Sequence, residues 1–332
     1  MILIDADVLG RQRTGDETHV SNLLRELPGV APDLRFGAVT RRPDLVPAGI
    51  EPIALAARFQ ETRMAVSLPR LLRRLRPELV HCQHALPLGW AGRSVVTLHD
   101  LSFEGGDSAM GLRDRLTFRA VVPRAARRAD RVLVVSERTR RDVVARYGIA
   151  EAKVTVTPNG VDPLFRPGGA ADGYLLFVGA VQARKDPLAA LGAARGVGLP
   201  LVVAGPLKDA ELARALRAGG ADLRGYIPTE ELAELYRGAA ALVLPSRFEG
   251  FGLPVLEAMA SGTPVVAADE PALREVGGDA VVYAADGDFT AAVRYALADR
   301  ARLAAAGLER AKGFSWRETA RRTAEAYRQV LA

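Results

Sequence analysis

Residues 240–266 read AALVLPSRFEGFGLPVLEAMASGTPVV, and this stretch decides the fold. It begins with an apolar run typical of a buried strand, continues through a glycine-containing loop, and then takes on a helical period. Gly250 and Gly252 allow backbone conformations closed to other residues and let a ligand approach the main chain. Pro254 fits the first turn of the helix, where no backbone N–H is needed. The stretch therefore predicts a strand–loop–helix unit whose helix start can bind an anion.

Two carboxylates flank this expected anion site. Glu249 lies in the loop, and Glu257 lies just over one turn inside the helix. A carboxylate is well suited to accept hydrogen bonds from sugar or ribose hydroxyls. The stretch therefore also predicts recognition of a hydroxyl-rich ligand.

Strands and helices alternate along the whole chain. Strands are expected at ILIDAD, RFGAV, LVHC, SVVTLHD, RVLVVS and KVTVTPNG in the first half, and at YLLFVG, LPLVVAG, LRGYI, AALVLPS, TPVVAAD and AVVYAAD in the second. Helices are expected over residues 17–27, 64–76, 111–128, 137–147, 187–195, 209–218, 229–239, 253–261 and 288–311. Near-continuous Val/Ile/Leu strands between helices indicate parallel sheets that are covered on both faces. We therefore predict an α/β protein with two doubly wound, Rossmann-like domains.

The boundary between the domains is expected in the Pro- and Gly-rich stretch PNGVDPLFRPGGAADG, residues 158–173. It divides the chain into an N-terminal domain, 1–160, and a C-terminal domain, 161–314, with an amphipathic helix over 315–332. Ligands of such folds bind outside the carboxyl ends of the strands. We therefore expect two sheets that face a central cleft.

The composition excludes several classes of protein. The chain has 332 residues, of which 49% are hydrophobic and 25% charged, so wholesale disorder is excluded. No apolar run reaches the length of about 18 residues that a spanning helix needs. Asp5 and Asp7 interrupt the stretch that a signal peptide would require. The single cysteine, Cys82, cannot form an internal disulfide or a thiolate metal cluster. We expect a cytoplasmic protein.

The loop and helix closely resemble the signature of the retaining family 4 glycosyltransferases, which have the GT-B fold. The resemblance rests on the spacing Glu249-x7-Glu257 within EGFGLPVLEAMASGTPVV, together with its glycines and Pro254. It implies that Glu257 binds the ribose of a nucleotide sugar and Glu249 the hydroxyls of its sugar. It also implies that backbone N–H groups meet the sugar and phosphate, namely those of Phe251, Gly252 and Leu253.

Two further stretches of the second half resemble the same family. In FVGAVQARKD, residues 177–186, Gly179 ends a strand, and Arg184 and Lys185 hold the diphosphate of the donor. A cation pair suits this role because the leaving nucleoside diphosphate gains negative charge. Many members carry an arginine after this glycine, where this chain has Ala180. In RGYIPTEELAELYRGA, main-chain groups of the base-binding turn contact the nucleobase, and this turn comprises Tyr226 and Ile227.

The first half matches the family more weakly. In RTGDETHVSNLLREL, Gly15 takes the place of a glycine that approaches the donor, and His99 in VVTLHDLSF matches a histidine that faces the transferred sugar. The alternative interpretation of His99 is an ordinary core or capping histidine. Asp16 and Glu17 complement the start of a helix or contact the acceptor. The terminal FSW…AYRQVL resembles a helix that crosses back onto the first domain.

We expect no metal cofactor. The sequence HCQH contains two histidines, His81 and His84, and one thiol, but a closed zinc site needs four ligands. Enzymes of the GT-B class generally need no catalytic metal, because helix ends and cations take over its work.

The excess positive charge lies in residues 1–160, and it is concentrated in two segments. One contains Arg58, Arg63, Arg70, Arg73, Arg74 and Arg76, and the other spans residues 113–131. Such surfaces attract anionic lipid headgroups, so peripheral contact with the inner face of the plasma membrane is one interpretation. Arginine-rich solvated helix faces are the other. Nucleic acid is not expected as a partner, because no recognition motif accompanies the charge.

Together these features predict a retaining, metal-independent hexosyltransferase. Its donor would be GDP-mannose or UDP-glucose, and its acceptor a glycan, a lipid-linked sugar or a small molecule. Two alternatives remain open at this point. One is a GT-B sugar-nucleotide 2-epimerase, and the other is a catalytically inactive scaffold that binds nucleotide sugars.

Overall fold

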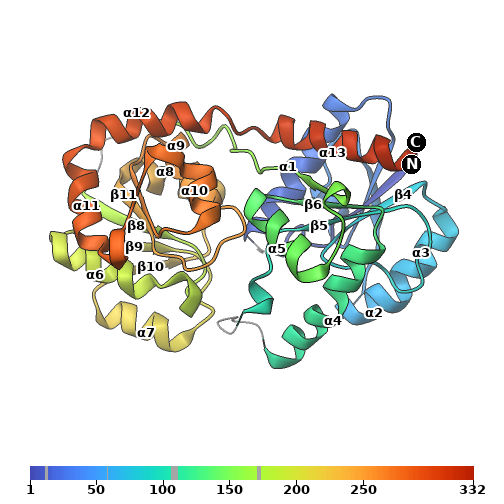
Figure 1. The fold of residues 1–332 in the computed structure, drawn as a ribbon, viewed down its shortest axis with the longest axis horizontal. Coiled ribbons are helices and arrows are strands. Elements are labelled where there is room, and N and C mark those ends of the chain that lie inside the picture. Colours follow the sequence, from blue (N-terminus) through green and yellow to red (C-terminus); the bar gives the residue numbers. More distant parts are fainter. Residues whose placement is uncertain (12–13, 58, 106–110, 170–172) are drawn as a thin grey trace. The chain divides into compact units, whose positions relative to one another are not determined.

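The computed structural model describes residues 1–11, 14–57, 59–105, 111–169 and 173–332. The chain forms two compact units, and Figure 1 labels many of their elements. The first unit comprises Met1–Leu101, Leu112–Gly160 and Trp316–Ala332. The second comprises Ser102–Gly111 and Val161–Ser315. Each unit contains one parallel β-sheet, as the alternating pattern predicted.

The sheet of the first unit has the strand order β3-β2-β1-β4-β5-β6-β7, and every neighbouring pair is parallel. The strands are β1 (Ile2–Asp5), β2 (Phe36–Thr40), β3 (Glu51–Ala54), β4 (Leu79–Gln83), β5 (Ser94–Leu98), β6 (Arg131–Val134) and β7 (Val154–Val156). The order reverses between β1 and β4, which is the switch point of a doubly wound sheet. Apolar side chains bury both faces of the central strands.

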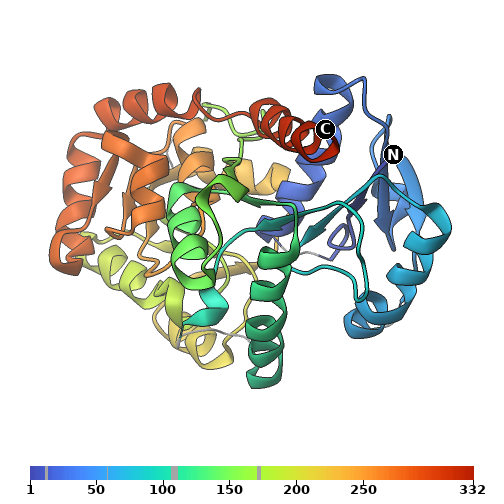
Figure 2. The same cartoon turned by 45° about the vertical axis from the view of Figure 1, so that its right-hand side comes forward.

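Helices cover this sheet. They are α1 (Thr14–Val30), α2 (Gln60–Thr62), α3 (Leu68–Leu75), α4 (Leu112–Arg128), α5 (Glu137–Tyr147) and α13 (Trp316–Leu331). The C-terminal helix α13 packs along α1, as Figures 1 and 2 show, and contributes Ala320, Ala324 and Tyr327 to the core around β1. Hydrogen bonds also link α13 to the sheet through His81 on β4. One ring nitrogen of His81 lies 2.6 Å from the Tyr327 hydroxyl, and the other lies 2.7 Å from the Thr97 hydroxyl.

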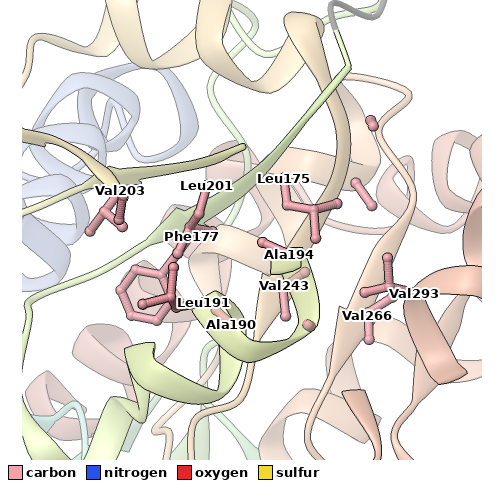
Figure 3. Packing of buried hydrophobic residues seen from close by; sticks show 14 of the residues in the cluster. Leu175, Phe177, Ala190, Leu191, Ala194, Leu201, Val203, Val243, Val266 and Val293 are labelled. Carbon is pink, nitrogen blue, oxygen red and sulfur yellow. The ribbon is translucent and has the colours of Figure 1, made fainter. Parts of the chain in front are cut away.

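The sheet of the second unit has the order β10-β9-β8-β11-β12-β13, again parallel throughout. Its strands are β8 (Tyr174–Val178), β9 (Leu201–Ala204), β10 (Asp222–Gly225), β11 (Ala239–Leu244), β12 (Val265–Ala267) and β13 (Val281–Tyr283). Its helices are α6 (Pro187–Val197), α7 (Ala210–Ala218), α8 (Thr229–Gly238), α9 (Leu253–Ala260), α10 (Pro271–Gly277), α11 (Phe289–Ala298) and α12 (Arg300–Ala311). Leu175, Phe177 and Val243 from the sheet pack against Ala190 and Leu191 of α6, as Figure 3 shows.

Several elements differ from the sequence prediction, and two short helices, α2 and α10, were not predicted. Strand β3 was missed because this edge strand contains Pro52 and is mostly exposed, so it carries no apolar run. The expected helix 288–311 is two helices, which are separated at Asp299. The expected helix 64–76 becomes α-helical only at Leu68, because residues 63–67 form a π-helical turn.

Arg63, at the start of that π-helical turn, is not part of a basic surface, and this expectation was wrong. Its side chain is fully buried and donates to both carboxylate oxygens of Asp5, over 2.8 and 2.7 Å, and to the Val39 carbonyl. A second carboxylate, Asp7, lies 3.5 Å from its Nε. A buried guanidinium needs such partners, because an unpaired buried charge is strongly destabilising. Arg58, from the same expected surface, lies outside the described residues.

Within the part of the chain that the structure describes, no helix combines the length and the apolar character that crossing a bilayer requires.

Candidate functional site

The candidate site in the second unit lies where the strand order reverses, between β8 and β11. The loop after β8 leads into the short helical turn η5 (Ala183–Lys185), and the loop after β11 leads into α9. Loops at such a switch point diverge and leave a crevice at the carboxyl edge of the sheet, where ligands bind in doubly wound folds. Arg184, Lys185, Glu249 and Glu257 all lie in or just after these two loops.

A buried ion pair joins the two loops. The ammonium group of Lys185 donates a hydrogen bond to Oε1 of Glu249, and each residue exposes less than a tenth of its surface. Burial would raise the pKa of the Glu249 carboxyl, but the charges of Lys185 and Arg184 outweigh it and lower that pKa. Glu249 is therefore ionised at neutral pH, and its charge is compensated by Lys185.

Arg184 connects the same loops through the backbone. Its Nη1 donates to the Phe248 carbonyl over 2.6 Å and lies 3.9 Å from Oε2 of Glu249. A second hydrogen bond between the same loops runs from the Arg247 N–H to the Arg184 carbonyl over 2.9 Å. Two cationic side chains are thus held beside one carboxylate, which leaves a local excess of positive charge at this edge.

Glycines allow the backbone to pass through this region. Gly179 follows β8 with a φ of +148°, and Gly205, at the end of β9, has a φ of +142°. A Cβ on Gly205 would lie 2.2 Å from the Gly179 carbonyl oxygen. The two backbone segments are therefore too close together for any residue other than glycine at position 205. Gly179 therefore lies as expected, directly after its strand.

Helix α9 begins next to the ion pair. Gly252 precedes it with a φ of +107°, and a Cβ there would lie 2.7 Å from Leu273. Phe251 is buried, with its ring 6.0 Å from that of Phe314, so any ligand contact from this residue would come from its main chain. Leu253 opens the helix, Pro254 after it has no N–H, and the N–H groups of Val255 and Leu256 donate to the Gly252 carbonyl over 3.0 and 3.2 Å.

Glu257 is buried inside α9 and accepts a hydrogen bond of 2.9 Å from the hydroxyl of Tyr236 on α8. Burial raises the pKa of Glu257 to about 7, and the charge of Asp162 adds to the rise, whereas the Tyr236 hydrogen bond opposes it. Tyr236 was not singled out from the sequence, because its place on the apolar face of α8 gave it the pattern of a core residue. Its buried hydroxyl, which needs a partner, was the available signal.

The expected base-binding turn leaves the same edge of the sheet from β10. Gly225 ends that strand with a φ of +67°. Tyr226 follows with an exposed side chain, and Ile227 is half-buried. The turn is separated from β8 by β9.

The first unit places the remaining expected residues at the carboxyl edge of its own sheet. His99 follows β5, and its Nε2 lies 2.9 Å from the amide oxygen of Gln83. Burial lowers the pKa of His99 to about 3, so the ring is neutral at pH 7. Gly15 lies in the first turn of α1, and a Cβ there would meet no described atom within 4 Å. No packing constraint of the described residues therefore explains a glycine at this position.

The two histidines of the sequence HCQH lie in different environments. His81 points into the core, as described above, whereas His84 lies beyond β4 with its ring 5.4 Å from that of His99. Asp16 of α1 lies 3.8 Å from Nε2 of His84 and 3.9 Å from Nε2 of His99. Sequence reasoning did not bring these three residues together, because they come from three separate elements.

Comparisons with known proteins agree with this architecture. The chain matches the family described as Glycosyltransferase Family 4 over residues 13–164, and the one described as Glycosyl transferases group 1 over residues 172–299. It is 30% identical to the O-antigen chain mannosyltransferase B of Escherichia coli, over 71% of this chain and 70% of that protein. It is 33% identical to the D-inositol 3-phosphate glycosyltransferase of Geodermatophilus obscurus, over 75% of this chain and 66% of that protein. Further relatives with the latter name are spanned over only 53% to 58% of their length.

Among solved structures, sucrose-phosphate synthase from Thermosynechococcus elongatus is similar with a TM-score of 0.76. The sequence identity is 22%, and the match covers 99% of this chain and 98% of that one. Together with the two parallel sheets, this likeness places the fold in the GT-B class.

The buried ion pair predicts a specific pattern of stability. Lys185→Met leaves the Glu249 carboxylate without its partner, so we expect the free energy of unfolding to fall by roughly 3–5 kcal/mol. Adding Glu249→Gln removes the second charge and should restore much of that loss. Lys312→Met is the matched control, because its pair with Glu309 is exposed and should contribute little. Urea titrations measure all four proteins, and equal losses for the two lysine variants would contradict the account of the pair.

Proposed function

Because the chain belongs to glycosyltransferase family 4, we propose that it transfers a hexose from a nucleoside diphosphate sugar to an acceptor, with retention of anomeric configuration and without a metal. The observation that carries this proposal is the pair of cations, Arg184 and Lys185, held beside Glu249 at the switch point of the second sheet. The start of helix α9 follows Glu249 by a few residues. Cations and a helix start together form a suitable site for a diphosphate.

Each residue of this site has a role in the proposal. Arg184 and Lys185 bind the diphosphate and stabilise the charge that develops as it leaves. When the diphosphate arrives, it competes with Glu249 for the Lys185 ammonium, which lets the carboxylate turn to the sugar hydroxyls. Backbone N–H groups at the start of α9 bind the sugar and phosphate, and they belong to Phe251, Gly252 and Leu253.

The proposal assigns further contacts to each unit separately. Glu257 binds the ribose hydroxyls, and the Tyr236 hydroxyl fixes the carboxyl group in the required position. Main-chain groups of Tyr226 and Ile227 bind the base, after the tight turn at Gly225. Gly179 keeps the end of β8 open for the phosphates. From the first unit, His99 is assigned to the transferred sugar and Gly15 to the donor.

The donor is proposed to be GDP-mannose, with UDP-glucose as the alternative. The name of the Escherichia coli relative, a mannosyltransferase of the O-antigen chain, supports mannose and a glycan acceptor. The relatives named D-inositol 3-phosphate glycosyltransferase support a small phosphorylated acceptor instead. A lipid-linked acceptor is compatible with the first of these names.

A panel of nucleotides tests the donor site. We expect GDP or UDP to raise the melting temperature, because a ligand at 100 times its Kd adds about 2.7 kcal/mol to stability. Glu257→Ala should reduce that rise, whereas Glu309→Ala, on the exposed face of α12, should leave it unchanged. No rise with UDP, GDP or ADP in folded protein would contradict the proposal. A rise without turnover would favour an inactive scaffold, and a free epimer formed without acceptor would favour a 2-epimerase.

We further propose that the first unit docks on the cytoplasmic face of a membrane. Helix α3 exposes Arg70, Arg73 and Arg74, and helix α4 exposes Leu112 and Leu116, which are 65% and 56% accessible. Basic residues attract anionic headgroups, and exposed leucines can insert beside them.

Co-sedimentation with vesicles tests the docking. We expect binding to vesicles that contain anionic lipid and weaker binding to neutral ones, because the arginines supply the attraction. The triple variant Arg70→Glu/Arg73→Glu/Arg74→Glu should lose the difference. Equal sedimentation of the wild-type protein with both kinds of vesicle would refute the docking.

A further inference from the structure

Three of the four histidines of the chain gather at one edge of the first sheet, whereas His81 points into the core. His84 follows β4, and His99 follows the neighbouring strand β5. His19 comes from α1, and its ring lies 4.8 Å from that of His99. Such a concentration in a chain with few histidines suggests a use for imidazole nitrogens beyond the single role assigned to His99.

Three side chains in this cluster present donor atoms to a common point. The carboxylate of Asp16 and one ring nitrogen each from His84 and His99 all lie within 4.8 Å of one another. Asp16 Oδ2 lies 3.8 Å from His84 Nε2, and Asp16 Oδ1 lies 3.9 Å from His99 Nε2. A tetrahedral ion with bonds of about 2.0–2.1 Å separates its ligand atoms by about 3.3 Å. The two Asp16 distances exceed this spacing by roughly half an ångström, and the widest separation in the set, at most 4.8 Å, exceeds it by at most about 1.5 Å, so side-chain rotation has to bring the three donors together.

A fourth donor lies at the same place. The Gln83 amide oxygen is 2.9 Å from His99 Nε2 and accepts its hydrogen bond. If the His99 ring carries its proton on Nδ1 instead of Nε2, Nε2 has a free lone pair. His99 Nε2 and the Gln83 amide oxygen can then both bind a cation. The set then consists of two imidazoles, one carboxylate and one amide oxygen.

The backbone holds these donors in position. His84 adopts a left-handed conformation with a φ of +61°, which is unusual for a residue other than glycine. The His84 N–H donates to the Thr97 carbonyl over 2.9 Å, and the Ala85 N–H donates to the Gln83 carbonyl over 2.7 Å. On the other side, His19 packs edge-on against His99 and is itself held by Asn159, 2.8 Å from its Nδ1. The backbone hydrogen bonds hold the turn that carries His84, and the packing of His19 restricts the ring of His99.

We propose that Asp16, His84 and His99, with the Gln83 amide oxygen, form a site for a divalent transition ion of the Zn²⁺ class, and that the ion inhibits sugar transfer by occupying His99. Imidazole ligands favour Zn²⁺ over Mg²⁺ or Ca²⁺, which prefer oxygen. The inhibition rests on the role proposed above for His99, whereas the binding of the ion does not. The ion is a regulator in this proposal, and transfer itself proceeds without it.

Binding is tested with Zn²⁺ alone on the untagged, full-length, metal-free protein, by equilibrium dialysis and elemental analysis. We expect one Zn²⁺ per chain, and at least tenfold weaker binding in Asp16→Asn and in His84→Gln. Glu17→Gln is the matched control, because Glu17 is the neighbouring carboxylate and instead accepts a hydrogen bond from the Gly10 N–H. No stoichiometric binding, or the same affinity in all four proteins, would overturn the site.

Inhibition is tested by the ratio of turnover with and without Zn²⁺ in each protein. We expect Zn²⁺ to lower turnover at least tenfold in the wild type and in Glu17→Gln. In His84→Gln, turnover with and without Zn²⁺ should be nearly equal. Stoichiometric binding with no inhibition would overturn the regulatory part. If the wild type shows no turnover with any donor, the proposed transfer fails, and the dialysis result still decides whether the ion site exists.

Discussion

The candidate site depends on an ion pair between one lysine and one glutamate, which are buried together when the chain folds. Lys185 and Glu249 are separated by 64 positions in the sequence, and their hydrogen bond brings together the loops that follow β8 and β11. Neither charge could remain buried without the other. The pair therefore fixes the distance between the two loops, and with it the position of Arg184 and of the start of α9. A ligand that carries its own negative charge can take the place of Glu249 beside Lys185, and the displaced carboxylate then needs other partners, of which Arg184, 3.9 Å away, is one.

The first unit satisfies the same constraint with different residues. Arg63 pairs with Asp5 at the end of β1 and lies near Asp7. A buried ion pair therefore also lies at the carboxyl edge of the first sheet. In the first unit the buried pair is structural, and the groups beside it that can meet ligands are histidines with Asp16. In the second unit the buried pair is itself proposed to meet the donor, together with Arg184 and Glu257. Burial raises the pKa of Glu257 to about 7, so a bound ligand can change the charge of this group near neutral pH.

The sequence was sufficient for the fold because parallel strands that are buried on both faces leave continuous apolar runs. β8 and β11 could be located in this way, whereas the exposed edge strand β3 could not. The sequence also named Lys185, Glu249 and Glu257 through a family signature, but it did not predict their partners. Arg63 was assigned to the surface because a local count of arginines does not include an aspartate 58 positions away. The group of Asp16, His84 and His99 was missed for the same reason, since its members meet only when β4, β5 and α1 fold together.

The central claim is that the loops after β8 and β11 bind the nucleoside diphosphate. Hydrogen–deuterium exchange of the backbone amides, compared with and without the nucleotide, tests this directly. The account predicts slower exchange in residues 179–186 and 246–257 when the nucleotide is bound, because both loops lose access to water. Slower exchange confined to the first unit, with no change in these two loops, would contradict it.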